Sequence, residues 1–191
     1  MNRNKPILFI GRIIESKGII TLINAYYQVA QDIQLCNPLW IIGGNISEIN
    51  QMRNRPEIKE KIDALEIRNQ LFWWGHLPHD ILPFIIRKCL FSCFTSKYEP
   101  GGRTILEAMA CGLPVIATPY GFAEEVVIQN KTGIVIRNDS LLEWVQSMKK
   151  MIESPEWAES LGKNAHELIC KRYSIKSFQA KHWAIYEKYN K

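Results

Sequence analysis

The sequence lacks the features that mark several classes of protein. No apolar run approaches the roughly 18 residues of a membrane-spanning helix. The basic start Met1–Pro6 is not followed by the longer apolar stretch and cleavage site of a signal peptide. We therefore expect a cytoplasmic protein, free or peripheral at the inner membrane face. The net charge of +5 forms no stripe interleaved with aromatic residues, which excludes nucleic acid and fits an anionic ligand or membrane surface.

The cysteines form no metal-binding pattern. The five residues include no Cys-x-x-Cys pair, and no His-rich segment accompanies Cys89 and Cys93, which argues against a zinc site. We expect buried free thiols in a reducing compartment. The cysteines are Cys36, Cys89, Cys93, Cys111 and Cys170. The six tryptophans lie mostly in apolar patterns, so we assign them to packing.

Motifs of several nucleotide enzymes and hydrolases are also missing. No Gly-x-Gly-x-x-Gly or Gly-x-Ser-x-Gly occurs, which argues against dinucleotide binding and α/β-hydrolase chemistry. The segment Gly11–Gly18 is no Walker A loop, because Ser16 replaces the glycine before Lys17. No Asp-x-Asp pair is present to hold a magnesium-bound diphosphate. We therefore expect no metal cofactor, and charge neutralisation falls to basic side chains and backbone amides.

What the sequence does contain is an alternation of short apolar runs and longer helical patterns. We expect strands at Ile7–Ile10, Leu39–Ile42, Leu71–Trp74, Leu90–Phe94, Val115–Ala117 and Ile134–Ile136. Helices are expected near Thr21–Ala30, Pro56–Leu65, His79–Lys88, Arg103–Ala110 and Ala123–Val127. Nearly continuous apolar strands indicate a doubly wound parallel sheet covered on both faces, that is, one α/β domain over residues 1–191. Extra C-terminal helices follow, opened by Ser140, Pro155 and Ser174.

Ligands of such sheets bind beyond the carboxyl ends of the strands. The loops expected there are Gly11–Gly18, Gly43–Asn45, Gly75–His79, Ser96–Thr104 and Thr118–Ala123. His76 and His79 fall in one of these loops. Neither has a Ser or Cys nucleophile nearby, so we assign both to capping or packing.

The loop Ser96–Thr104 carries the densest chemistry. Gly101 and Gly102 precede a helix, so its free amides and dipole can bind an anion. Glu107, inside that helix, is suited to accept hydrogen bonds from ribose hydroxyls, and Glu99 can reach the opposite end of the same ligand. In the loop Gly11–Gly18, Arg12 and Lys17 could both face phosphate oxygens. Taken alone, each of these charged residues could instead simply be solvated at the surface.

Together these segments resemble one protein family. The stretches Ile7–Gly18, Leu39–Gly44 and Phe72–His76 are similar to the first three strands and loops of the group 1 retaining glycosyltransferases. The stretch Tyr98–Ala117 resembles the family's Glu-x7-Glu signature, with Glu99 and Glu107 as its glutamates. The likeness continues through Gly121–Val127, Lys131–Gly133 and the closing helices.

The resemblance implies the Rossmann-like C-terminal domain of a GT-B enzyme, which binds a nucleoside-diphosphate sugar. Gly11, Arg12 and Lys17 would hold the diphosphate, and the two cations would stabilise the departing nucleotide. Glu107 would bind ribose, while Glu99 would contact the sugar near the reacting face. Amides of Gly102, Arg103 and Thr104, beside Gly101, would meet the phosphates, and Gly121 would lie near the sugar. The family is associated with same-face attack assisted by the leaving phosphate.

The sequence departs from the family pattern around the sugar. Gly101-Gly102 stands where Phe-Gly is common, Arg103 replaces a smaller or apolar residue, and Phe122 replaces the second glycine of a Gly-Gly turn. These changes leave the sugar undetermined. The family's N-terminal acceptor domain is absent, so we expect that domain in a longer protein or a partner chain.

Three functions follow from the resemblance. The first is the donor half of a hexosyltransferase acting on a glycan or lipid-linked acceptor. The second is a non-catalytic sugar-nucleotide-binding module that pairs with a separate acceptor subunit. The third is a nucleotide-sugar epimerase, for which no acid and base groups are identified.

Overall fold

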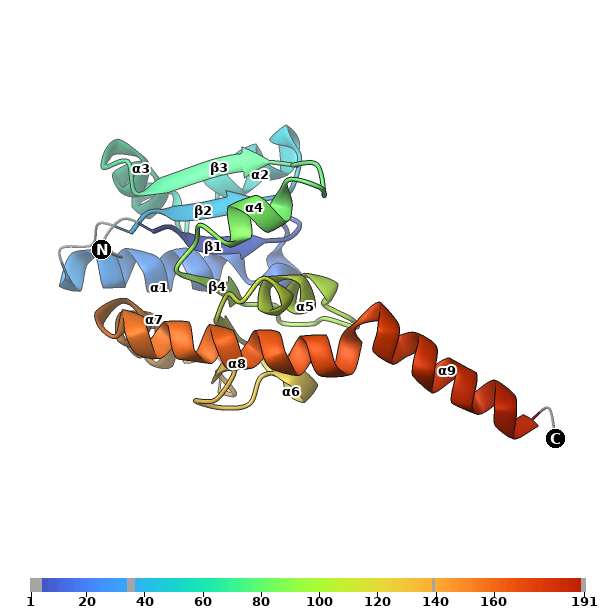
Figure 1. Cartoon of the computed structure of the whole chain (residues 1–191). Coiled ribbons are helices and arrows are strands. Elements are labelled where there is room, and N and C mark those ends of the chain that lie inside the picture. The colour runs from blue at the N-terminus through green and yellow to red at the C-terminus, as the bar shows by residue number, and fades with distance from the viewer. Residues whose placement is uncertain (1–4, 34–36, 139, 190–191) are drawn as a thin grey trace.

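The fold is a doubly wound parallel sheet, as the sequence predicts. The computed structural model describes residues 5–33, 37–138 and 140–189. Its strands are β1 (Ile7–Ile10), β2 (Leu39–Ile42), β3 (Leu71–Gly75), β4 (Phe91–Phe94), β5 (Val115–Ala117) and β6 (Gly133–Val135). They lie in the order β3-β2-β1-β4-β5-β6, all neighbours parallel (Figure 1). The chain winds outward from β1 to β3 and then returns to β4, which creates a crevice between β1 and β4.

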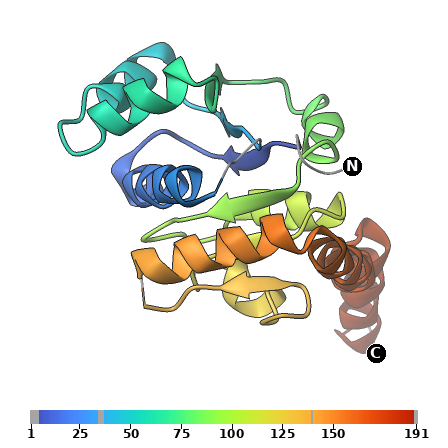
Figure 2. The same cartoon turned by 90° about the vertical axis from the view of Figure 1, so that its left-hand side faces the viewer.

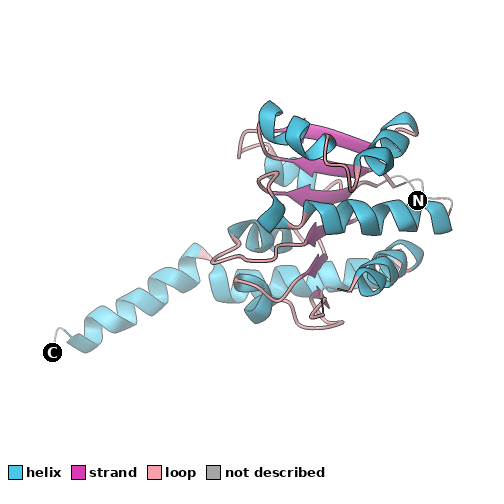
Figure 3. Cartoon of the chain, turned by 180° about the vertical axis from the view of Figure 1, so that it is seen from behind, coloured by secondary structure: helices cyan, strands magenta, loops and turns pink. Residues whose placement is uncertain are grey.

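Helices cover both faces of this sheet (Figure 3). They are α1 (Ile19–Asp32), α2 (Ile46–Arg53), α3 (Lys59–Ile67), α4 (Leu82–Ile86), α5 (Arg103–Ala110), α6 (Phe122–Val126), α7 (Leu141–Glu153), α8 (Pro155–Tyr173) and α9 (Ile175–Tyr189). The predicted caps of the C-terminal helices are confirmed. Ser140 Oγ accepts from the Glu143 amide, Pro155 opens α8, and Ser174 Oγ accepts from the Ser177 amide.

The sequence analysis missed α2, whose polar sequence has little apolar periodicity. A capping box starts this helix. Asn45 Oδ1 accepts from the Glu48 amide at 2.9 Å, and the Asn45 amide donates to Glu48 Oε2 at 3.3 Å. Asn-x-x-Glu was therefore the available signal, since such a box satisfies two amides that the helix cannot.

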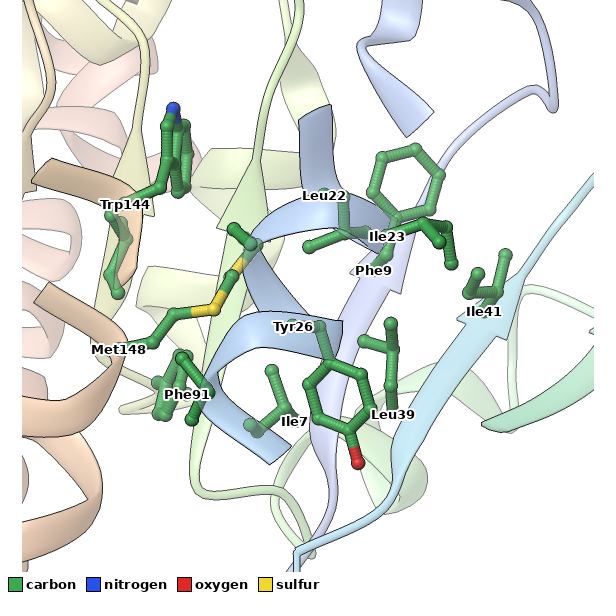
Figure 4. Packing of buried hydrophobic residues seen from close by; sticks show 14 of the residues in the cluster. Ile7, Phe9, Leu22, Ile23, Tyr26, Leu39, Ile41, Phe91, Trp144 and Met148 are labelled. Atoms are coloured by element: carbon green, nitrogen blue, oxygen red, sulfur yellow. The ribbon is translucent and has the colours of Figure 1, made fainter. Parts of the chain in front are cut away.

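Two apolar clusters fill the space between sheet and helices, because successive strand residues point to opposite faces. Ile7 and Phe9 belong to the cluster under α1 and α7, and Leu8 and Ile10 to the cluster under α4 and α5. Figure 4 shows the first cluster, to which α7 contributes the fully buried Trp144. Burial of this kind supplies most of the free energy that holds the layers together.

The edge strand β3 corrects the expectation that every strand is covered on both faces. Its residues alternate in exposure, with Phe72 and Trp74 facing outward at 38% and 47% exposure. Trp74 contacts the half-buried Trp40 edge-on, with ring centroids 5.1 Å apart. Trp74 and Trp183, which is 67% exposed, also correct the assignment of the tryptophans to packing. The apolar pattern of β3 could not reveal that this strand lies at the edge of the sheet.

The cysteine thiols differ in burial. Cys89 and Cys93 are buried and free, as expected, and burial raises the pKa of Cys89 to about 12. Cys111 is half-buried and Cys170 is exposed, so the expectation of burial is wrong for Cys170. Cys36 lies outside the described residues.

The last helix leaves the body of the domain. α9 continues from the end of α8 and projects away from the sheet (Figures 1 and 2). None of its described side chains is buried. No helix in the described ranges combines the length and apolarity needed to cross a bilayer.

Candidate functional site

A cavity of about 830 Å³ opens at the carboxyl ends of β1 and β4. Four of the five loops singled out from the sequence contribute to its wall, and the loop Gly43–Asn45 does not. The residues that line it include Gly11, Arg12, Lys17, His79, Ser96, Glu99, Gly101, Gly102, Arg103, Thr104, Glu107, Thr118, Tyr120 and Phe122. Its size suits a ligand larger than a mononucleotide base or a sugar alone.

The loop after β1 is held firmly against the loop after β4. A short 3-10 turn ends at Lys17, and Gly18 follows in the left-handed region with φ 69°. A Cβ at Gly18 would lie 1.9 Å from the Thr95 carbonyl oxygen, so only glycine allows this approach. Thr95 Oγ1 also donates to the Lys17 carbonyl at 2.8 Å. These contacts fix where the Lys17 side chain enters the cavity.

Lys17 and Glu99 form an ion pair inside the cavity wall. The Lys17 ammonium group donates to Glu99 Oε2, and the two side chains are only 23% and 17% exposed. Burial alone would raise the pKa of Glu99. The hydrogen bond and charge of Lys17, together with the Gly101 and Gly102 amides, outweigh burial and lower it. Glu99 is therefore held in its ionised form. Its partner Lys17 lies 82 residues away in sequence.

The start of α5 offers backbone amides to the same cavity. Gly102 precedes the helix in a left-handed conformation with φ 77°, and no side chain caps the first turn. Gly101 donates its amide to Glu99 Oε1 at 3.3 Å. The first turn, with Arg103 and Thr104, is thus uncapped and combines amides with the positive end of the helix dipole. The exposed Arg103 lines the cavity, and no carboxylate among the described residues forms an ion pair with it.

Glu107 faces the cavity from α5 and contacts His79. The His79 Nε2 atom lies 3.3 Å from Glu107 Oε1, and the His79 side chain is 79% exposed. The packing half of the capping-or-packing assignment is therefore wrong for His79, because its ring is exposed to solvent at the cavity rim. His79 is the wall residue that sequence reasoning undervalued. The signal in the sequence was that His79 follows a strand, at the edge where ligands bind. Its contact with Glu107 arises only from the fold. His76 is exposed and does not line the cavity.

Arg12 stands at the rim beside the missed helix α2. Its Nη2 atom lies 3.6 Å from Glu48 Oε1, while Glu48 Oε2 accepts from the Asn45 amide. The Arg12 side chain is 70% exposed. The pair is long and its arginine is solvated, although Glu48 is only 20% exposed, so the pair contributes little to stability and leaves Arg12 available to another anion.

Gly121 supports the cavity without lining it. Its backbone angles, φ 58° and ψ −139°, are readily adopted only by glycine. A Cβ at this position would lie 2.5 Å from the Gly101 carbonyl oxygen. The next amide, of Phe122, donates to that same oxygen at 2.9 Å. Gly121 therefore packs the turn of α6 against the Gly101-Gly102 turn, and its neighbours Tyr120 and Phe122 reach the cavity.

Taken together, the wall provides cations, free helix amides and two separated carboxylates. Within the described ranges, no three His, Cys, Asp or Glu side chains are grouped to hold a metal ion. Such a wall can bind an elongated anion by its charged middle and hydrogen-bond hydroxyl groups at either end.

The chain matches one protein family and several proteins of known sequence. The family model described as glycosyl transferases group 1 matches residues 2–168. The chain is 27% identical to alpha-maltose-1-phosphate synthase of Mycolicibacterium smegmatis over 97% of this chain and 48% of that protein. The chain spans about half the length of this and other curated relatives it matches.

The chain also superposes on parts of longer solved structures. Sucrose-phosphate synthase of Thermosynechococcus elongatus superposes with a TM-score of 0.81 at 25% identity, covering 97% of this chain and 46% of that one. A TarM mutant of S. aureus, in complex with fondaparinux, alpha-GlcNAc-glycerol and UDP, has a TM-score of 0.80 at 25% identity. That match covers 95% of this chain and 35% of TarM.

Proposed function

This chain belongs to the group 1 glycosyltransferases, and from that premise we propose that it supplies the donor-binding half of a retaining hexosyltransferase. Its ligand is a nucleoside-diphosphate sugar. The observation that carries the proposal is that Arg12, Lys17, the uncapped start of α5, Glu99 and Glu107 all line one cavity. Cations and free amides suit a diphosphate, and the two carboxylates suit the hydroxyl groups of a sugar and a ribose. The UDP bound in the TarM structure supports the ligand class.

In this proposal each group has one task. Arg12, Lys17 and the amides of Gly102, Arg103 and Thr104 hold the diphosphate. Glu107 accepts hydrogen bonds from the ribose, and Glu99 accepts them from the sugar. The acceptor hydroxyl attacks the anomeric carbon on the face that the diphosphate leaves. The carbon–oxygen bond to phosphate breaks, its electron pair goes to the phosphate oxygen, and that oxygen takes the acceptor's proton.

Two cations would serve as the electrophilic catalysts of this step. Arg12 and Lys17 can neutralise the charge that grows on the leaving diphosphate, so we propose transfer without a metal cofactor. No wall side chain is proposed as a covalent nucleophile, because both carboxylates are assigned to hydroxyl groups. Same-face attack then accounts for retention of configuration.

The acceptor, a glycan or lipid-linked molecule, would bind outside the wall described here. Arg12 and His79 are 70% and 79% exposed at the rim, so water reaches the bound diphosphate in this chain alone. We propose that an acceptor-binding domain, in the same polypeptide or a partner, covers the rim. Exclusion of water would then strengthen the electrostatic contacts. We accordingly expect slow transfer by the isolated chain.

A thermal-shift panel tests the donor assignment. Nucleoside diphosphates and their sugar derivatives, with uracil, guanine or adenine as the base, should raise the melting temperature for one base, because a ligand of the folded state stabilises it. The matched 2′-deoxyribonucleoside diphosphate should raise it less. No shift with any of these compounds would overturn the proposed function.

The variant Glu107→Ala sharpens that test. It should bind the ribonucleotide and the deoxyribonucleotide of the preferred base equally, since the acceptor of the ribose hydroxyls is gone. An unchanged preference for ribose in this variant would show that Glu107 is not the ribose contact.

A further inference from the structure

We propose that Glu99 makes the site bind the complete sugar nucleotide in preference to the bare nucleoside diphosphate. Lys17 leaves Glu99 at low cost only when a hydroxyl group of the sugar replaces the lysine as the hydrogen-bond partner of Glu99. This inference rests on the proposed function. It goes beyond it by assigning to one ion pair the discrimination between the donor and the nucleotide left after transfer.

The geometry of the free site carries the argument. Lys17 donates to Glu99 Oε2 while the Gly101 amide donates to Glu99 Oε1, so both carboxylate oxygens are occupied. At 23% and 17% exposure, the two side chains are largely shielded from water. A carboxylate in this position is costly to leave without partners.

A bare nucleoside diphosphate must draw Lys17 away from Glu99 to use its charge. The phosphate then gains a cation, but the shielded Glu99 carboxylate loses its strongest partner and faces a new anion. A sugar nucleotide brings hydroxyl groups to the same place. These hydroxyls donate to Glu99 Oε2 and replace the lost hydrogen bond, so the exchange of partners is complete only with the sugar present.

The other ion pairs of the wall are unsuited to this role. Arg12–Glu48 is 3.6 Å long with Arg12 70% exposed, and His79–Glu107 has His79 79% exposed. Water can solvate the freed arginine or histidine after separation, and Glu48, itself only 20% exposed, keeps the Asn45 amide as a partner, so breaking these pairs costs little. The Lys17–Glu99 pair alone, among the described pairs of the wall, is shielded on both sides.

The test compares two binding constants in three proteins. The dissociation constants of the preferred nucleoside diphosphate and of its glucose derivative are measured by titration calorimetry for the wild type, Glu99→Gln and Glu48→Gln. Glutamine has nearly the shape of glutamate and can still accept from the Gly101 amide. Thermal unfolding of each variant verifies folding.

In Glu99→Gln the bare nucleotide should bind more tightly by roughly fivefold to tenfold, because Lys17 is no longer held by a carboxylate. The sugar derivative should bind no more tightly than in the wild type, since its hydroxyls meet a neutral amide. The ratio of the two constants should therefore shift at least about fivefold toward the bare nucleotide.

Glu48→Gln is the matched control. It removes the same charge beside the other phosphate-facing cation, Arg12, and glutamine still completes the capping box. Both ligands should gain affinity together, with an unchanged ratio. If the wild type binds both ligands and the ratio of the two dissociation constants is the same in Glu99→Gln, this inference is overturned and the proposed function stands. A failure of every protein to bind either ligand would overturn both.

Discussion

At the scale of single residues, charged partners decide the state of the site. Glu99 is held ionised by a lysine from another loop, and Glu107 meets a histidine from a third. The partner of each carboxylate is therefore distant in sequence. The motif predicts which glutamates lie near a ligand, but their free-state partners come from the fold.

The depressed pKa of Glu99 predicts a pH dependence of stability. Its folded pKa lies below the ordinary value of 4.5, so the pair contributes stability above that pH and loses it as the pH falls through the folded pKa. Urea unfolding should show the wild type more stable than Glu99→Gln near pH 7. The difference should shrink below about pH 4.5. A difference independent of pH would contradict this explanation.

At the scale of elements, close backbone approaches position α5 and α8. Gly162 lies within α8, where a Cβ would meet the Gly112 carbonyl oxygen at 2.1 Å and Pro114 Cδ at 3.0 Å. The turn after α5 thus packs directly on α8. Since α5 carries Glu107 and the helix amides of the cavity, this approach supports the site from behind.

The substitution Gly162→Ala tests the close packing of α8 on Gly112, because packing and helix propensity predict opposite changes in the free energy of unfolding. Helix propensity alone would stabilise the variant by about 1 kcal/mol. The clash with the backbone of Gly112 should instead lower the free energy of unfolding by about 2 kcal/mol. Chemical denaturation measures the difference. The exposed position Glu167→Ala on the same helix should change it by less than about 0.5 kcal/mol, and a stabilised Gly162→Ala would refute the close packing.

At the scale of the whole molecule, the domain ends before its last helix. The two apolar clusters draw on the sheet and on helices up to α8, and no described residue of α9 joins either one. α9 carries exposed aromatic side chains, among them Phe178, Trp183 and Tyr186. Its helical form in this chain rests on capping and on its junction with α8.

Truncation after Ser174 should therefore leave the domain intact. Removal of residues 175–191 is expected to change the melting temperature by less than about 3 °C, because little apolar area is withdrawn from the clusters. Differential scanning calorimetry of both chains measures this. A large loss of stability would show that α9 packs against something in solution, and a matching change in molecular mass would identify a second copy.

The sequence by itself determined the parallel α/β fold, most strand positions and the loops that hold the site. Apolar runs and glycine turns are local signals, and their alternation leaves few ways to build a covered sheet. It did not determine α2, whose capping box is polar, or the exposure of Phe72 and Trp74, which depends on the place of β3 at the edge of the sheet. Only the tertiary structure decided that Lys17 pairs with Glu99, Arg12 with Glu48 and His79 with Glu107. Those pairs join segments that follow β1, β2, β3 and β4, and these segments become neighbours because parallel strands end at one edge of the sheet. No spacing along the chain encodes a distance in space.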